Sequence, residues 1–141
     1  MKLELLGSFL QQVKDAQGTN AKKDLLERFL SYEEFRLLMK VSFDPYITFG
    51  VNDFPEDESD SYDEGIEFTH FFNFIDEMFQ RMVTGNEALN LCRIIHQKSH
   101  PNFKPFVKGI LSKDLKLGVG IKTINEIHPE LISEYWKRAV S

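Results

Sequence analysis

Apolar residues recur three or four positions apart along almost the whole of this 141-residue sequence. That spacing places them on one face of an α-helix, whereas a half-buried strand would need strict alternation. Turn-forming residues separate the apolar segments, among them Gln17-Gly18, Asp44-Pro45 and the stretch from Ser99 to Asn102. The pattern predicts an all-α fold in which about seven helices form a single compact domain over residues 1–141.

The starts of two predicted helices are marked by a capping box. Serine or threonine is followed three positions later by glutamate at Ser31–Glu34 and at Thr84–Glu87. A phenylalanine-rich stripe over residues 68–82 is typical of a central core helix. Two further helices are expected, one ending near Ile127 and one over residues 131–139. The residues predicted to face the core are Leu3, Leu6, Leu10, Val13, Leu25, Leu26, Phe29, Leu30, Phe35, Leu38, Met39, Phe68, Phe71, Phe72, Ile75, Phe79, Met82, Ala88, Leu91, Cys92, Ile95, Phe103, Phe106, Val107, Ile110 and Leu111.

An acidic loop is expected at residues 52–67, after an extended connector at 46–51. Its carboxylates superficially resemble a calcium-binding loop. In the register that starts at Asp57, however, Tyr62 occupies the position that requires glycine, and no other register restores the motif. The loop is therefore interpreted as a solvated surface segment, with a protein-contact surface as the alternative.

Charge is distributed unevenly along the chain, which has a formal net charge of −5. Residues 41–80 contain eleven acidic and no basic side chains, whereas residues 81–122 contain eight basic and two acidic ones, a local charge of +6. A polyanion close to the surface responds to the local patch more than to the whole protein. The basic block is therefore compatible with a nucleic-acid partner despite the acidic total.

Residue types that carry enzyme chemistry are sparse in this sequence. Cys92, His96 and His100 have helical spacing that could suit zinc, but Pro101 should end the helix before His100, and no fourth ligand lies nearby. A buried cysteine beside two partly exposed histidines is the preferred interpretation. The sequence lacks a P-loop, and Gly118-Val119-Gly120 without a preceding strand is no dinucleotide fingerprint. No catalytic residue, metal ligand or cofactor is therefore assigned to this chain.

The cysteine content and the hydropathy of the sequence predict the cellular location of the protein. A single cysteine excludes an internal disulfide framework and is typical of a reducing, intracellular setting. No apolar run approaches the roughly 20 residues of a membrane span, and the N-terminal segment does not resemble a signal peptide. The expected location is the cytoplasm, without a membrane partner.

The stretch KDLKLGVGIKTINEIHP, residues 113–129, combines lysines with two glycines just ahead of a short helical pattern. Glycines permit a positive φ and the close approach of another backbone. The first turn of the following helix presents unpaired N–H groups, which attract an anion such as phosphate. A glycine helix stop followed by a solvated basic helix explains the same residues equally well. The candidate phosphate-binding residues, which include two lysines of the preceding helix, are Lys104, Lys108, Lys113, Lys116, Gly118, Gly120, Lys122 and Thr123.

Two stretches, MVTGNEALNLCRII and FVKGILSKDLKLGVGIKTINEIHPELI, resemble the N-terminal DNA-binding domain of ATP-dependent DNA ligases, most closely the bacteriophage type. The family pattern is T-G-N-x-A at a helix start, then D-L-x-x-G-x-[SG], then T-I-N-x-[VI]-x-P. The resemblance covers residues 84–132 well and residues 1–50 only in helical layout, with DPYITFGV at 44–51 similar to the family's connector. The matching positions are Thr84, Gly85, Asn86, Ala88, Asp114, Leu115, Gly118, Gly120, Thr123, Ile124, Asn125, Ile127 and Pro129.

This resemblance implies an all-helical domain that grips nicked duplex DNA through the phosphates and the minor-groove face, with Lys113–Thr123 as a principal backbone-contacting element. Such contacts carry little sequence information. A ligase also needs the lysine nucleophile of a K-x-D-G motif, which this chain lacks. ATP and Mg²⁺ would therefore belong to a separate catalytic domain, and the chain alone is not expected to be an enzyme.

The resemblance also bears on the parent protein. The preferred expectation is a domain of a longer ligase that acts in DNA replication or repair in a bacterial or phage-infected cell; the alternative is a free-standing relative. The acidic loop at 52–67 is absent from the family pattern. In a second hypothesis, the chain is a protein-interaction module whose acidic loop contacts a replication partner such as a sliding clamp.

Overall fold

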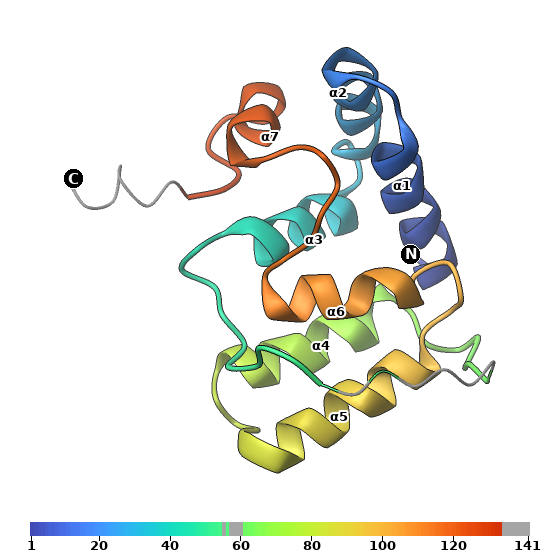
Figure 1. Ribbon diagram of the computed structural model, residues 1–141, viewed down its shortest axis with the longest axis vertical. Coiled ribbons are helices and arrows are strands. Elements are labelled where there is room, and N and C mark those ends of the chain that lie inside the picture. The colour runs from blue at the N-terminus through green and yellow to red at the C-terminus, as the bar shows by residue number, and fades with distance from the viewer. Residues whose placement is uncertain (55, 57–60, 134–141) are drawn as a thin grey trace.

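The computed structural model of the chain describes residues 1–54, 56 and 61–133. Seven α-helices form in this part of the chain, and the same residues contain no strand, which confirms the predicted all-α fold. The helices are α1 (Leu3–Asp15), α2 (Thr19–Phe29), α3 (Glu33–Phe43), α4 (Phe68–Phe79), α5 (Gly85–Lys98), α6 (Lys104–Ser112) and α7 (Ile121–Ile127) (Figure 1).

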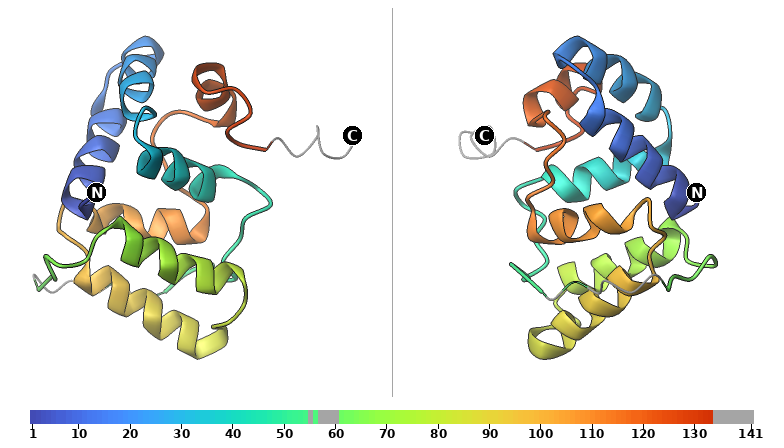
Figure 2. Two further views of the ribbon diagram at one scale, coloured as in Figure 1. Left: turned by 180° about the vertical axis from the view of Figure 1, so that it is seen from behind. Right: turned by 45° about the vertical axis from the view of Figure 1, so that its right-hand side comes forward.

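Helix α6 lies at the centre of the molecule, where it contacts α1, α3 and α5. Helix α1 packs against α2, and α2 packs in turn against α7. Figure 2 shows α4 and α5 side by side on one side of α6, with α3 on the other. Because α6 is held from several directions, its outward face and the chain that follows it have a defined position on the surface.

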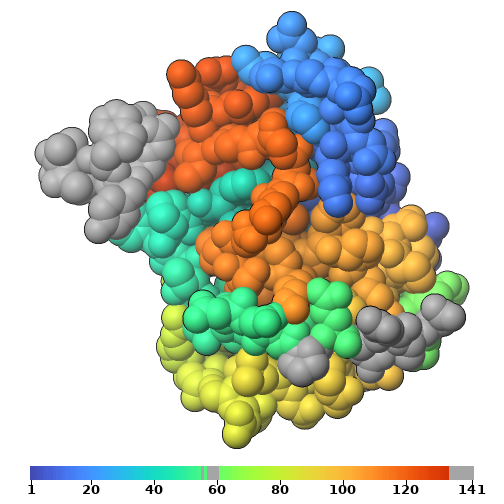
Figure 3. Space-filling model, viewed as in Figure 1, coloured from blue at the N-terminus to red at the C-terminus, as the bar shows by residue number. Residues whose placement is uncertain are grey.

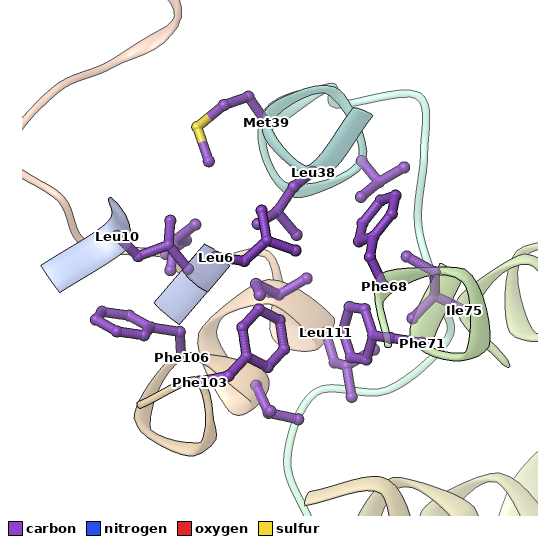
Figure 4. Close-up of a cluster of buried hydrophobic side chains, with 14 of the residues drawn as sticks. Leu6, Leu10, Leu38, Met39, Phe68, Phe71, Ile75, Phe103, Phe106 and Leu111 are labelled. Atoms are coloured by element: carbon purple, nitrogen blue, oxygen red, sulfur yellow. The ribbon is translucent and has the colours of Figure 1, made fainter. Parts of the chain in front are cut away.

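The core forms where α1, α3, α4 and α6 meet (Figure 4). Leu6, Leu38, Phe71 and Phe103 are fully buried there, and the rings of Phe71 and Phe103 meet edge to face at a centroid distance of 5.1 Å. Burial of one such side chain contributes about 1.5–3 kcal/mol. Aromatic residues from the predicted stripes therefore pack with aliphatic side chains in the core that surrounds α6.

Neither predicted capping box forms in the structure. Helix α3 begins at Glu33, and the Ser31 hydroxyl instead donates a hydrogen bond of 2.7 Å to the carbonyl of Arg28 at the end of α2. Thr84 occupies the predicted N-cap position of α5, but its side chain makes no capping hydrogen bond. The short connection after α2 explains the first difference, because the serine bonds backward to the helix that it follows.

Two residues of the predicted core stripe at 68–82 are exposed. Helix α4 ends at Phe79, which has 43% of its surface exposed, and Met82 is 69% exposed. Arg81 adopts a positive φ of 60°, so the chain leaves the helical path before Met82. The predictions that Phe79 and Met82 are buried were therefore wrong: Phe79 is the last residue of α4, and Met82 lies past the end of the helix.

The helix predicted over 131–139 does not form at its described residues. Residues 131–133 are not helical, and residues 134–139 lie outside the described part of the chain. The Asn125 side chain exchanges two hydrogen bonds of 2.9 Å with the backbone of Ile132. These bonds occupy both backbone groups of Ile132 and hold this segment against α7.

Candidate nucleic-acid interface

The candidate interface is built on the outward face of α6 and on the segment that follows it. Phe106, Val107, Ile110 and Leu111 turn the other face of α6 into the core. Helix α6 ends at Ser112, after which the chain turns, and Figure 3 shows residues 113–120, in orange, crossing the surface between α6 and α7. The basic part of the sequence is thus largely a surface feature.

A surface hollow of about 370 Å³ lies where α6, the end of α1 and the start of this segment meet. It brings together Lys14 from α1, Lys108 from α6 and Lys116 from the segment after α6. Among the described residues of the lining, Asp114 is the only acidic one. We call this site the basic hollow; its lining residues are Lys14, Asn52, Pro105, Phe106, Lys108, Gly109, Ser112, Asp114, Leu115 and Lys116.

Lys14 and Lys116 are the two most open cations of the basic hollow. The ammonium of Lys14 lies 5.9 Å from the ring centroid of Phe106, so the aromatic face holds it at the edge of the hollow. The Lys116 side chain is 82% exposed, and its ammonium lies 3.5 Å from the Asp114 carboxylate, which is itself 66% exposed. Exposed pairs of this kind are weak, so both lysines are available to an anion.

Lys108 is paired within the molecule. Its ammonium lies 2.5 Å from Oδ1 of Asp53 and 3.8 Å from Oε1 of Glu56. The hydrogen bond to Asp53 raises the pKa of Lys108, and the same bond lowers the pKa of the Asp53 carboxyl. The beginning of the acidic segment therefore lies against the basic hollow, an arrangement that the sequence did not indicate.

Lys113 is turned away from solvent, in contrast to the expected phosphate contact. It caps α6 with a left-handed φ of 64°, and its ammonium donates a hydrogen bond to the carbonyl of Val41 in the last turn of α3. The same ammonium lies 5.7 Å from the ring centroid of Phe49. Burial lowers the pKa of Lys113 to about 8, with the Asp44 carboxylate opposing the shift. This geometry favours a structural role for Lys113.

The half-buried position of Lys113 predicts a pH dependence of stability. The pKa of Lys113 is about 8 in the folded protein and 10.5 for an unperturbed lysine. At pH values between these two, the unfolded chain therefore binds more protons than the folded protein. Stability should therefore rise with pH in this window. Relative to the Lys113→Met variant, the free energy of unfolding of the wild type should rise by less than about 1.4 kcal/mol per pH unit. Urea unfolding at several pH values from about 7.5 to about 10 measures this difference, and a constant difference would contradict the lowered pKa of Lys113.

The two glycines differ from each other in conformation. Gly118 has a φ of 77°, and a Cβ atom at this position would lie 2.9 Å from Cε of Lys22, so glycine is strongly favoured. Gly120 has a φ of −124° and open space around it, so it does not use the positive φ that glycine permits. The turn between α6 and α7 therefore uses a left-handed backbone conformation at Gly118 and not at Gly120.

Lys22 explains why the turn at Gly118 is fixed. Its ammonium donates hydrogen bonds to the carbonyls of Val13 at 2.6 Å, Lys14 at 3.0 Å and Leu117 at 3.0 Å. These bonds join the end of α1 to the segment after α6. Lys22 thereby holds in register the two parts of the chain that contribute Lys14 and Lys116 to the basic hollow.

The remaining predicted residues lie outside the basic hollow. Lys104 is the first residue of α6, Gly120 is the N-cap of α7, Lys122 is exposed in the first turn of α7, and Thr123 is partly buried beside it. Helix α7 packs against α2, and an exposed ion pair between Lys23 and Glu126 at 2.8 Å joins their surfaces. Of the eight predicted residues, only Lys108 and Lys116 line the hollow.

A larger hollow of about 590 Å³ adjoins the basic hollow across Pro105. Its lining is mostly uncharged, with the amides Gln11, Gln12 and Asn102, and Asp15 is its one charged residue. A phosphate group would meet a carboxylate but no cation in this larger hollow. The smaller, basic hollow is therefore the better candidate for a polyanion.

Other constellations in the described part of the chain do not form a chemical site. No three histidine, cysteine or acidic side chains gather there in a way that could hold a metal ion. Cys92 is buried beside Met78, and burial raises the pKa of its thiol to about 11, which disfavours the reactive thiolate. His96 is only 3% exposed, so the expectation of a partly exposed side chain was wrong. No described helix is both long and apolar enough to cross a bilayer.

In fold, the chain resembles part of a DNA ligase. Solved structures of the ligase Pmar-Lig show this likeness: Pmar-Lig_PreS3 matches with a TM-score of 0.81 and 24% identity over 91% of this chain. A second structure, Pmar-Lig_Pre., matches with a TM-score of 0.76 and 26% identity over 86% of this chain. The chain spans only 31% and 28% of the length of these two structures. No family model and no curated protein sequence matches it.

Proposed function

We propose that this chain is the DNA-gripping domain of an ATP-dependent DNA ligase and binds nicked duplex DNA without regard to sequence. The observation that carries the proposal is the basic hollow, where lysines from three separate elements meet in a fold that resembles part of a DNA ligase. Lysine ammonium groups neutralise backbone phosphates and release the bound counterions, which drives binding to any sequence.

The composition of the basic hollow supports phosphate contact over base recognition. Its described lining residues include three lysines, which act as flexible point charges, and no arginine, whose planar fork is best suited to bidentate contacts with guanine. Phosphate contacts position a protein on the duplex and carry no direct sequence information. A domain of this kind suits an enzyme that must close nicks in any sequence.

The chemical step is proposed to lie outside this chain. Ligation proceeds through a lysine nucleophile that takes up AMP, and the sequence contains no K-x-D-G motif to supply it. ATP and Mg²⁺ would accordingly bind to a catalytic domain of the parent ligase. The contribution of this chain is to hold the duplex, through Lys14, Lys116 and, once it is released from its ion pair, Lys108.

Binding to nicked duplex should depend steeply on salt. If three phosphates are neutralised, the slope of log K against log salt is about −2.7, and affinity falls about 40-fold between about 50 and 200 mM. Fluorescence anisotropy with a labelled nicked duplex at both salt concentrations measures this slope. A duplex of unrelated sequence should give the same affinity. Absence of binding at the lower salt concentration would reject the proposed function.

A further inference from the structure

We propose that Asp53 competes with DNA phosphate for Lys108 and thereby sets the affinity of the basic hollow for DNA. The inference rests on the proposed function and concerns the regulation of the same site. Lys108 lines the hollow, and its ammonium lies 2.5 Å from Asp53 Oδ1. Figure 3 shows the chain that leads to residue 54, in green, bordering α6. A phosphate that approaches Lys108 therefore meets a carboxylate already in place.

Asp53 is held at this position by buried neighbours. Phe49, Val51 and Phe54 are 3%, 7% and 3% exposed, so the chain on both sides of Asp53 is anchored in the core. The backbone N–H of Phe54 donates a hydrogen bond of 2.9 Å to Oδ1 of Asp53. The ring of Phe54 also lies 5.7 Å from the Lys108 ammonium. The ion pair is thus part of a defined local structure, which makes the carboxylate a persistent competitor.

The pair is nevertheless open enough to be displaced. The side chain of Asp53 is 76% exposed and that of Lys108 is 34% exposed, so a rotation of the carboxylate into water frees the ammonium. A second carboxylate, Glu56, lies 3.8 Å away. A single small anion gains little by replacing these groups, because exposed ion pairs are weak and similar in strength. A duplex gains more, since its neighbouring phosphates bind Lys14 and Lys116 at the same time.

The test is the substitution Asp53→Asn. The amide keeps the oxygen that accepts the Phe54 N–H but loses the negative charge that holds Lys108. We expect nicked duplex to bind to the Asp53→Asn variant about two- to fivefold more tightly than to the wild type at low salt. Glu77→Gln removes the same charge from the exposed face of α4, away from the hollow, and measures the effect of net charge alone. Thermal unfolding of each variant verifies that the fold is retained.

A Lys108→Gln background makes the test specific for the pair. If Asp53 acts through Lys108, the gain from Asp53→Asn in this background should shrink to the value given by Glu77→Gln. An undiminished gain, or an Asp53→Asn variant that binds no better than Glu77→Gln, would overturn the competition while leaving duplex binding intact. Failure of all these proteins to bind the duplex would instead reject the proposed function.

Discussion

A variant that carries both Lys14→Glu and Lys116→Glu should bind nicked duplex at least about a hundredfold more weakly than the wild type at low salt. These lysines are the most open cations of the basic hollow, and they come from elements that Lys22 joins through three carbonyls. Reversing their charge removes two phosphate contacts and adds two repulsive ones. The slope of log K against log salt should also become shallower by about 1.8.

A matched control separates this surface from the effect of total charge. Arg28→Glu with Lys98→Glu changes the net charge by the same amount, at exposed positions on α2 and α5 that do not line the basic hollow. We expect the affinity of this control for nicked duplex to fall by less than about tenfold. Anisotropy titrations of both double variants, with circular dichroism to verify folding, make the comparison. Equal losses would mean that the duplex does not lie on the basic hollow.

The helical fold was predictable because its signal is local. Residues three or four positions apart report which face of a helix is buried, and Leu6, Leu38 and Phe71 follow this rule. The errors arose where local spacing stopped being informative. Met82 continues an apolar stripe but lies past the turn at Arg81, whose positive φ no apolar pattern reveals. Helix ends are set by backbone turns and by tertiary contacts as much as by the stripe itself.

The candidate site was only partly predictable, because it depends on contacts between distant parts of the chain. Charge and spacing indicated Lys108 and Lys116, which do line the basic hollow. Lys14 was missed, since nothing in the sequence places the end of α1 beside α6. Lys113 was included because it is a lysine in a basic segment, yet it bonds to the carbonyl of Val41. Whether a lysine meets solvent or a helix end is decided by tertiary packing.

Gly7→Ala should lower the free energy of unfolding by about 3 kcal/mol or more. In an exposed helix this change would be stabilising by about 0.5–1 kcal/mol, because alanine is the better helix former. Gly7, however, is buried in α1, and a Cβ atom there would lie 2.3 Å from the carbonyl carbon and oxygen of Asn102 and 2.6 Å from the nitrogen of Phe103. All three atoms are backbone, so relief requires α1 to move away from the start of α6.

Chemical denaturation of Gly7→Ala beside Gly120→Ala tests this contact. Gly120 has open space around it and a negative φ, so its substitution should change stability by less than about 1 kcal/mol. The two variants should also differ in function: because Lys14 lies in the last turn of α1 and lines the basic hollow, a shift of that helix should displace Lys14 and weaken duplex binding. A Gly7→Ala variant as stable as the wild type would show that the backbone of α1 is not in close contact with the backbone at the start of α6. The placement of Lys14 beside Lys108, which depends on this contact, would then be contradicted as well.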